Sequence, residues 1–472
     1  MFSKLITALE GVIDVANTAL YSYVLIIILI AAGLVFTVTT KLAQFRLLPA
    51  QIKAVSDRPG EKSGVSSFQA LMVSTASRVG TGNIVGVATA ICAGGFGSVF
   101  WMWIIAIVGG ASAFIESTLA QIFKKRGPDG CYGGPAYYIE QGLRCRTLGI
   151  VFAIFLIVTY GFGFNMLASY NLQSTFSTYS FYNASVTPWV IGGILAVGVG
   201  YCIMGGGKRI LKATGVLVPV MGCVYILVAF VITVLNITEL PAVFVRIFTE
   251  AFDLKAIFGA FGGSCVMHGI KRGLYSNEAG VGSAPNASAS AEVDHPVKQG
   301  LVQVLSVFID TLLVCSATAF MCMTSGVDES SVSDGAVYVQ TALSATLGAF
   351  GPIFITAAMI LFAFTTLLGN LYYVEQCYFY IFKRKPGVIF NTVSRIVASL
   401  LILFGAVLSA DLLWGIADVT MGLMTLINIP VICLLGKYAI RALKDYEKQT
   451  KEGKSPTFKA TDIGLSDLDY WN

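Results

Sequence analysis

Long apolar segments recur throughout this chain and constrain its fold more than any other feature. Eleven segments approach or exceed the length of about 20 mainly apolar residues that a membrane-spanning helix needs. They lie near residues 17–40, 66–93, 97–123, 147–177, 186–204, 213–235, 254–270, 299–324, 352–382, 391–409 and 412–435. Of all residues, 56% are hydrophobic and 12% charged, and the mean hydropathy is +0.77. We therefore predict an all-α integral membrane protein with eleven transmembrane helices.

The distribution of basic residues predicts how these helices are oriented. Short cytoplasmic loops carry an excess of Lys and Arg, and most basic residues here fall in alternate connections and in the C-terminal tail. One of these connections is taken to contain Lys271, Arg272 and Lys298. The pattern predicts a cell-membrane protein with its N-terminus outside and its C-terminus in the cytoplasm. It also explains the net charge of +5 without a nucleic-acid partner.

The rarer side chains bear on which class of membrane protein this is. The ten cysteines are scattered without a Cys-x-x-Cys pair, and there are only two histidines, His268 and His295. A membrane enzyme or redox subunit would need clustered His, Cys or carboxylate ligands, which the sequence does not show. We therefore expect a transporter rather than an enzyme, with a channel as the alternative that would need a continuous polar pore.

One apolar segment, near 66–93, is interrupted by Val79-Gly80-Thr81-Gly82-Asn83. Two glycines flanking one residue weaken a helix by roughly 2 kcal/mol relative to alanine. They also expose backbone groups that hydrocarbon cannot satisfy, so such a break persists where it lines a cavity or holds a ligand. We expect the functional site here.

The order of the spans predicts an inverted repeat. When the first helix is set aside, ten remain, and because five is odd the second five enter the membrane from the opposite side. The second set opens with the segment near 254–270, where Gly262 and Gly263 predict a corresponding break. Two broken helices at matching positions indicate a transporter substrate site, although glycines also serve close helix packing. The predicted core is therefore a 5+5 inverted repeat with two discontinuous helices, preceded by one extra helix.

This organisation divides the chain into four regions. Residues 1–63 hold the extracellular N-terminus, the extra helix and a basic cytoplasmic loop, 64–236 the first repeat and 237–436 the second. Residues 437–472 are charged and lack a core-forming pattern, so we expect a short helix and then a flexible cytoplasmic tail.

Ionisable residues inside the spans are candidates for gating, because an unpaired charge there costs a few kcal/mol or more. Arg78 directly precedes the first break. It either closes the cytoplasmic path by pairing with Glu116, Asp310 or Glu375, or forms a structural ion pair. Other residues receive structural roles: Lys271, Arg272 and Glu278 are solvated or capping groups toward the inner face, and Phe164, Phe261 and Trp414 pack.

Two stretches resemble a known family. The first is Gly94-Gly95-Phe96-Gly97-Ser98-Val99-Phe100-Trp101-Met102-Trp103, and the second is Lys271-Arg272-Gly273-Leu274-Tyr275-Ser276-Asn277-Glu278-Ala279-Gly280. Both resemble the alanine or glycine:cation symporters, also called sodium:alanine symporters, apart from Ser98, where Gly or Ala is usual. The resemblance covers nearly the whole chain. It implies the 5+5 core of the amino acid, polyamine and organocation transporters and Na⁺-driven uptake of a small neutral amino acid such as alanine or glycine.

Within that fold the chemistry required is binding of a zwitterion. Backbone amides at Gly80, Thr81 and Gly82 can replace water around the substrate carboxylate, beside a half-helix N-terminus whose dipole favours negative charge. Carbonyls around Gly262 and Gly263 are expected to accept from the ammonium. Asn83 either orients the loop or touches substrate or ion.

The resemblance also implies an ion site. Carried over residue by residue, it assigns the co-transported Na⁺ to the carbonyls of Ala76, Val79 and Phe362 and to the hydroxyls of Thr365 and Thr366. All five ligands are neutral oxygens, a set that suits a monovalent ion. A proton-coupled transporter or a uniporter of the same fold is the alternative.

Departures from the family bear on the substrate. Many members have Gln at the position of Ala168, three residues after the Asn that corresponds to Asn165, and many have Trp at the position of Asn370. Both positions are expected to line the pocket. An amide in place of an indole makes glutamine an alternative to alanine and glycine. The expected partners are the amino acid, Na⁺ and the lipid bilayer.

Overall fold

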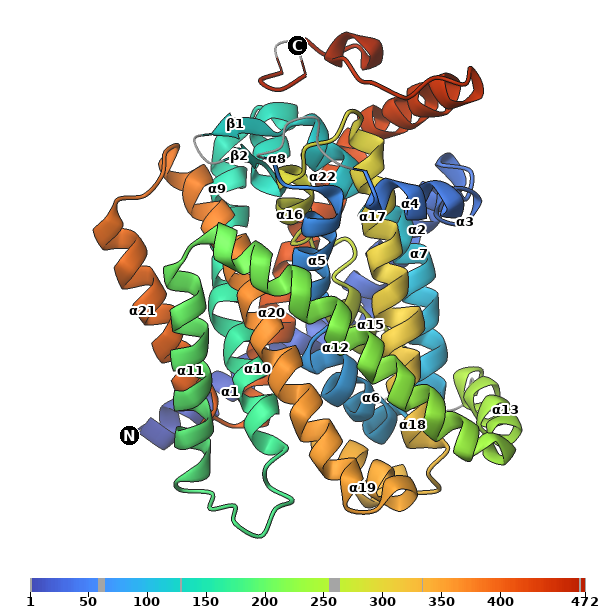
Figure 1. The fold of residues 1–472 in the computed structure, drawn as a ribbon, viewed down its shortest axis with the longest axis vertical. Helices are drawn as coiled ribbons and strands as arrows, with labels where there is room; N and C mark the ends of the chain where they lie inside the picture. Colours follow the sequence, from blue (N-terminus) through green and yellow to red (C-terminus); the bar gives the residue numbers. More distant parts are fainter. Residues whose placement is uncertain are drawn as a thin grey trace.

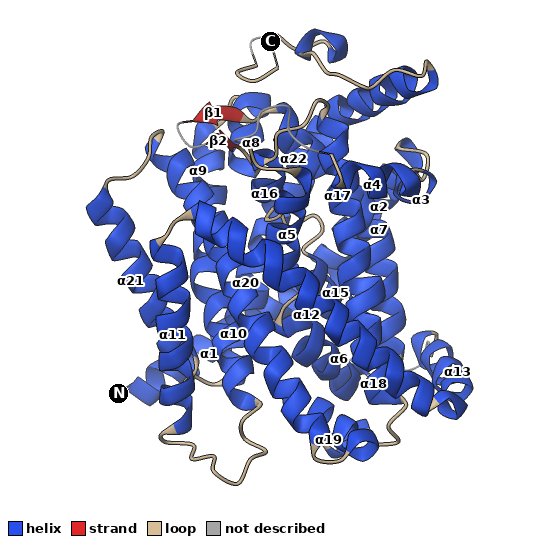
Figure 2. Ribbon diagram, in the orientation of Figure 1, coloured by secondary structure: helices blue, strands red, loops and turns tan. Residues whose placement is uncertain are grey.

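The computed structural model describes residues 2–57, 64–127, 130–253, 264–332, 334–466 and 468–471, with side chains from residue 10 onward except residue 23. Helices make up almost all of the structure, apart from a small hairpin of β1 (Lys125–Gly127) and β2 (Gly130–Tyr132) (Figure 2). Within the described residues, nine helical stretches are long and apolar enough to cross a membrane. They are Glu10–Thr39, Gly97–Ile122, Arg146–Ser174, Thr187–Met204, Gly207–Leu235, Pro296–Met323, Phe350–Phe382, Val388–Gly405 and Ala410–Lys451.

The long helices follow one another in chain order with short helices between them. The N-terminal part contains α1 (Phe2–Ala19), α2 (Leu25–Thr39), α3 (Ala43–Arg46), α4 (Leu48–Val55), α5 (Ser67–Arg78), α6 (Val87–Gly94) and α7 (Gly97–Ile122). The middle contains α8 (Pro135–Leu143), α9 (Arg146–Leu156), α10 (Phe164–Ser174), α11 (Thr187–Met204), α12 (Gly207–Leu235) and α13 (Leu240–Ala251). Then come α15 (Cys265–Asn277), α16 (Pro285–Ser290), α17 (Pro296–Val307), α18 (Ser316–Met323), α19 (Gly335–Leu347), α20 (Phe350–Phe382), α21 (Val388–Gly405) and α22 (Ala410–Lys451).

Two groups of helices flank the first predicted break. In one group α7 packs against α2, α15 and α17; in the other α10, α11, α20 and α21 pack against one another (Figure 1). Helix α5 lies between the groups, against α12 and α20 on one side and α16 and α17 on the other. The segment that contains Gly80 is therefore buried in the centre of the molecule.

Apolar side chains face outward on the peripheral helices. Val197 on α11 is 75% exposed, and Val388 and Ile389 at the start of α21 are each 82% exposed. Polar side chains instead concentrate inside, where Asn83, Asn165, Asp310 and Asn370 are fully buried. This inversion of the usual soluble pattern is what a lipid solvent requires.

A second break in the backbone follows α15, at residues 278–284. Residues 254–263, which include Gly262, Gly263 and Phe261, fall outside the described residues. The described helix α15 continues past the predicted end at 270, and the chain leaves the helix after Asn277. Glu278 is left-handed (φ 54°), and Gly280 and Gly282 have φ of 85° and 90°, before α16 begins.

Two expectations are wrong. Lys271 and Arg272 lie within α15, at the end of the molecule where Glu10 and Asp411 lie, rather than in one connection with Lys298. The sequence analysis ended this helix at residue 270, where the apolar run ends, whereas the helix continues through the two buried cations.

The C-terminal tail is packed rather than flexible: Phe458, Leu468 and Trp471 are buried, and the Trp471 indole donates to the Gln121 carbonyl (2.7 Å). Burial of these aromatic side chains orders the tail in spite of its many charged residues.

Candidate functional site

The first break opens because the Asn83 side chain and a short backbone turn each divert one helical hydrogen bond. Helix α5 starts with a capping box formed by Ser66 and Gln69 and ends at Arg78, after which Val79 has φ −75° and ψ 86°. The Gly80 amide donates to Asn83 Oδ1 (2.8 Å), and the Asn83 amide donates to the Gly80 carbonyl (3.1 Å). In a regular helix these amides would bond the carbonyls of Ala76 and Val79. Both carbonyls are thereby released from their helical donors.

The glycines at the break are needed for close approach. A Cβ at Gly80 would overlap the Thr366 hydroxyl on α20, and one at Gly82 would overlap the Tyr275 ring on α15. The broken segment therefore touches α20 and α15 through its backbone. Residues Gly82–Gly86 form a wide π-helical turn before α6 continues.

The two threonines assigned to the ion differ. Thr366 Oγ1 is buried and has no hydrogen-bond partner among the described residues. Thr365 Oγ1 donates to the Leu361 carbonyl (2.9 Å), with the Phe362 carbonyl at 3.2 Å. A buried hydroxyl without a partner is costly, so the Thr366 oxygen beside Gly80 marks a place for a ligand. The structure thus places Thr366 beside Gly80 in the break and leaves Thr365 bonded to its own helix.

A polar chain connects the predicted pocket residues to the second break. Asn370 Nδ2 donates to Asn165 Oδ1 (3.0 Å), and the Ser77 hydroxyl lies 2.7 Å from Asn370 Oδ1 and 2.9 Å from Glu278 Oε1. The Ser283 hydroxyl donates to Glu278 Oε2 (2.6 Å). Sequence analysis gave Glu278 a peripheral role, but the residue is fully buried. Ala168 lies on the same helix as Asn165 and is also buried.

Asn83 holds the loop rather than standing free. Its amide accepts from Gly80 and donates to Asp310 Oδ1 (2.7 Å). Asp310 Oδ2 accepts from Ser276 (2.7 Å) and Thr311 (2.8 Å). Of the two roles expected for Asn83, this geometry describes the orienting one. Asp310 is the anchor of that loop.

Arg78 forms no ion pair among the described residues. Its Nη1 donates to Gln303 Oε1 (2.8 Å), while Nε and Nη2 are buried without a hydrogen-bond partner in the part of the chain that is described. Glu375 instead pairs with Arg395 (2.6 Å), and Glu116 accepts from Asn428 (2.8 Å). In this structure Arg78 therefore does not pair with Glu375, Glu116 or Asp310, the three carboxylates named as candidates. The sequence does not show that Glu375 and Glu116 already have other partners, Arg395 and Asn428.

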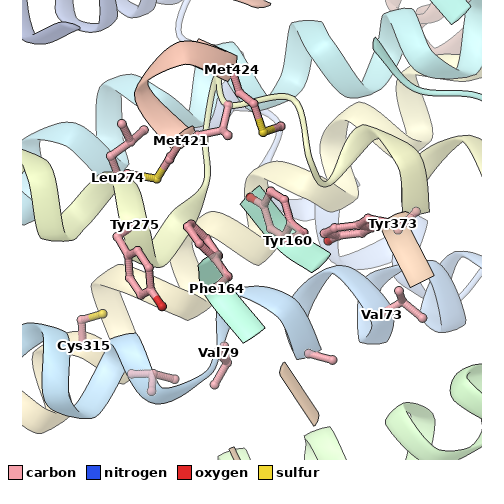
Figure 3. Packing of buried hydrophobic residues seen from close by; sticks show 14 of the residues in the cluster. Val73, Val79, Tyr160, Phe164, Leu274, Tyr275, Cys315, Tyr373, Met421 and Met424 are labelled. Carbon is pink, nitrogen blue, oxygen red and sulfur yellow. The ribbon is translucent and has the colours of Figure 1, made fainter. Parts of the chain in front are cut away.

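Aromatic rings close one end of the site. The Phe164 ring lies between those of Tyr160 and Tyr275, at 4.7 and 4.6 Å between centroids, and Val79 lies nearby (Figure 3). Tyr275 in turn contacts Trp414 (4.9 Å). Phe164 and Trp414 do pack, as expected, and their packing covers the break.

Charged groups reinforce this aromatic layer. The Arg272 guanidinium lies 3.9 Å from the centre of the Trp414 ring. Asp418 on α22 forms ion pairs with both Lys271 (2.7 Å) and Arg272 (3.1 Å), and all three side chains are nearly buried. Helices α15 and α22 are thus joined at this end of the molecule.

The opposite end contains a cavity of about 640 Å³. Its lining comes from the residues before α5, from β2, from the starts of α12 and α21, and from α20, and it reaches Ser290 and Tyr372. The Glu375–Arg395 pair stands in its wall. The aromatic and charged layer thus lies at one end of the molecule and the cavity at the other.

Comparison with known proteins places this geometry in a family. A model of the sodium:alanine symporter family matches residues 6–460. The chain belongs to the sodium:alanine symporter family. It is 42% identical to the amino-acid carrier protein AlsT of Bacillus subtilis (strain 168) over 463 residues, covering 98% of this chain and 97% of the relative. It is also 42% identical to the probable sodium/glutamine symporter GlnT of the same organism, covering 95% and 93%.

The fold resembles that of a solved structure. The crystal structure of MhsT in complex with L-phenylalanine superposes with a TM-score of 0.52 at 14% identity, covering 86% of this chain and 94% of that one. At that identity the likeness concerns the fold. Together with the apolar helices, family membership makes this chain a multi-pass membrane protein of a transporter family.

Two site residues were missed from the sequence. Ser77 precedes Arg78, and Glu278 lies inside the second family stretch. The available signal was Glu278-Ala279-Gly280-Val281-Gly282, because two glycines after a helical run favour positive φ. Glu278 was missed because a charged residue beside these glycines was interpreted as solvated.

Proposed function

We propose that this protein drives uptake of a small neutral amino acid with the Na⁺ gradient. One observation carries the proposal: the released carbonyls of Ala76 and Val79 belong to a break that packs against the Thr366 hydroxyl, which has no hydrogen-bond partner among the described residues. Neutral oxygens converging at a buried point suit a monovalent cation. The family name and the printed names of AlsT and GlnT support an amino acid as the co-transported solute.

The Na⁺ ligands would be the carbonyls of Ala76, Val79 and Phe362 and the hydroxyls of Thr365 and Thr366. The Thr366 hydroxyl has no hydrogen-bond partner among the described residues, so its oxygen is available to bind Na⁺. The Thr365 hydroxyl donates a hydrogen bond to the Leu361 carbonyl, which leaves the lone pairs of its oxygen for a cation. Transported Na⁺ therefore enters a site that needs little rearrangement.

The amino acid would bind beside this ion. Its carboxylate would meet the backbone amides at Thr81 and Gly82, because the amide of Gly80 is engaged by Asn83. Its ammonium would meet the carbonyls of the second break at 278–284; those around Gly262 and Gly263, which lie outside the described residues, are the suppliers predicted from the sequence. The amides of Asn165 and Asn370 supply polar groups for a side chain, and Asn165 Nδ2 has no partner among the described residues.

Alternating access would use the two different ends. The layer of Phe164, Tyr275 and Trp414 with the Asp418 pairs closes the outer end, and the 640 Å³ cavity opens toward the cytoplasm. This assignment orients the protein in the cell membrane with its N-terminus outside and C-terminus inside. The structure then corresponds to an inward-facing form with a closed centre.

Uptake into proteoliposomes tests the proposal. Labelled alanine, glycine and glutamine are offered under an inward Na⁺ gradient, and K⁺ and pH gradients serve as controls. We expect Na⁺-dependent uptake of at least one substrate, abolished in Thr366→Ala. Uptake that follows the pH gradient, or that is indifferent to both Na⁺ and Thr366, would contradict the ion site and indicate proton coupling or uniport.

A further inference from the structure

The C-terminal segment, residues 458–471, packs at the end of the molecule where the β1–β2 hairpin lies (Figure 1). Within its described part the Phe458 and Trp471 side chains are buried, and the Ala460 amide donates to the Trp471 carbonyl (3.0 Å). The Arg441 guanidinium of α22 donates to a backbone carbonyl of the segment (3.0 Å). The segment is therefore folded on itself and anchored to α22. The proposed substrate and ion sites do not involve it.

The last residues of the C-terminal segment hold the end of α7 and the chain that follows it. The Trp471 indole donates to the Gln121 carbonyl (2.7 Å). The Lys124 ammonium lies 3.8 Å from the centre of the Tyr470 ring, a cation–π contact. The Asp469 carboxylate accepts from a backbone amide of β1 (2.6 Å). Three consecutive side chains thus bind this part of the chain.

The residues held in this way bind the end of α16 in turn. The Gln121 side-chain amide donates to the Ser288 carbonyl and to the Ala291 carbonyl (2.8 Å). Lys124 Nζ also donates to the Ala291 carbonyl (2.9 Å). Lys124 is fully buried, and a buried ammonium is costly without partners of this kind. The Tyr470 ring therefore helps to keep the Lys124 ammonium on α16.

A second contact reaches the connection between α16 and α17. The Phe458 ring packs against the His295 ring, with 5.2 Å between centroids, and against the Trp471 ring at the same distance. His295 caps α17 by accepting from the Val297 amide (3.2 Å). The C-terminal segment thus contacts the end of α7 on one side and the chain that leaves α16 on the other.

The end of α16 is also part of the wall of the 640 Å³ cavity. Ser290 of α16 lines this cavity, and so does Val65, which precedes α5. The Glu292 amide donates to the Val65 carbonyl (2.9 Å), which joins the two parts of this wall. Other lining residues come from α12, α20 and α21. A displacement of the α16 wall relative to α7 breaks the hydrogen bonds from Gln121 and Lys124.

We propose that the C-terminal segment is a strap that restrains the widening of the 640 Å³ cavity. It holds Gln121 and Lys124 in the positions from which they bind the α16 carbonyls, so it favours the narrow form of the cavity. Release of the segment shifts the population toward a wider form. This inference rests on the proposed function in one respect, the assignment of the cavity to the cytoplasmic transport path.

Cysteine alkylation of the full-length protein in nanodiscs tests the strap. Ser290→Cys places a thiol in the cavity wall, and its reaction with a water-soluble maleimide is followed by peptide-mapping mass spectrometry. The native Cys145, which is exposed, is the internal reference. In this background Trp471→Ala removes the indole that holds Gln121. Trp189→Ala is the matched control, because it removes the same side chain at the start of α11, where it is 45% exposed.

We expect Trp471→Ala to raise the alkylation rate at position 290 by about tenfold relative to Cys145, and Trp189→Ala by less than about twofold. Tyr470→Ala removes the ring beside Lys124 and should raise the rate by about threefold. This second variant decides the test if thermal unfolding shows that Trp471→Ala does not fold.

Unchanged alkylation in the folded variants of the C-terminal segment would overturn the strap, as would an equal rise in these variants and in the control. Because alkylation requires no substrate, its result is independent of the uptake assay. Faster alkylation in Trp471→Ala together with uptake that is indifferent to Na⁺ would support the strap and contradict the proposed Na⁺ coupling alone.

Discussion

The two breaks in the centre of this protein are both held by side-chain hydrogen bonds, but with different chemical groups. At the first, an amide side chain, Asn83, satisfies the Gly80 amide and leaves carbonyls free beside the Thr366 hydroxyl. At the second, the carboxylate of Glu278 accepts hydrogen bonds from Ser77 and Ser283. The first break therefore presents neutral oxygens to a ligand, whereas at the second the Glu278 carboxyl group holds α5 and the break at 278–284 together through hydrogen bonds. The two breaks need not share a role.

The largest expected effect concerns close approach at the first break. Gly80→Ala places a Cβ onto the Thr366 hydroxyl, and such overpacking costs about 1–3 kcal/mol. Uptake should fall by roughly ten- to a hundredfold. Gly86→Ala is the matched control, because its Cβ would meet Trp414 at an ordinary 3.5 Å. Equal loss in the two variants, measured as initial rates in proteoliposomes, would remove the special role of the first break.

The second break should respond in stability rather than in ion affinity. Glu278→Ala leaves the Ser77 and Ser283 hydroxyls without this acceptor, at a cost of about 1–3 kcal/mol. Thermal unfolding should shift downward, while the half-saturating Na⁺ concentration stays within about twofold. Glu278→Gln, which keeps an acceptor oxygen, should lose less stability. If Glu278→Ala instead abolishes Na⁺ dependence, the division of roles between the breaks is wrong.

Asn83 tests how the first break frees its carbonyls. In Asn83→Ala the Gly80 amide loses its acceptor and can return to the Ala76 carbonyl, so the half-saturating Na⁺ concentration should rise about tenfold. Thr311→Val removes one hydrogen bond from Asp310 and leaves the Asn83–Gly80 contact in place. A similar rise in both variants would assign the effect to Asp310 instead. Na⁺ titrations of uptake separate the outcomes.

The smallest effect is expected at Thr365. Thr365→Ser keeps the hydroxyl that donates to Leu361 and removes only a methyl group. Na⁺ titration of uptake should give a half-saturating concentration within about twofold of the wild type. A larger change would mean that the methyl group, rather than the oxygen, positions this part of α20.

Sequence patterns anticipated most of the fold because lipid permits few backbone solutions. Nine of the predicted spans appear as continuous helices, and the first break lies at Gly80 and Gly82 as expected. The predicted break at Gly262 and Gly263 lies outside the described residues, whereas the break at 278–284, which contains Gly280 and Gly282, was not predicted. Lys271 and Arg272 were misplaced because Asp418, which pairs with both, is distant in sequence.

The pairwise contacts of the site were beyond the reach of the sequence. Arg78 was expected to find a carboxylate, but its described hydrogen bonds go to Gln303. Which polar groups meet in a buried site depends on helix rotation by a few tens of degrees, and hydropathy does not encode such rotation. Close packing alone decides it.

Equilibrium binding of ²²Na⁺ to the purified protein tests the central claim most directly. Wild type, Thr366→Val and the control Gly86→Ala are compared in the absence of amino acid, with thermal unfolding as the check on folding. The released carbonyls and the Thr366 oxygen predict saturable binding in wild type and control, weakened by about tenfold or more in Thr366→Val. Unchanged ²²Na⁺ affinity in Thr366→Val would contradict the assignment of the ion to the first break.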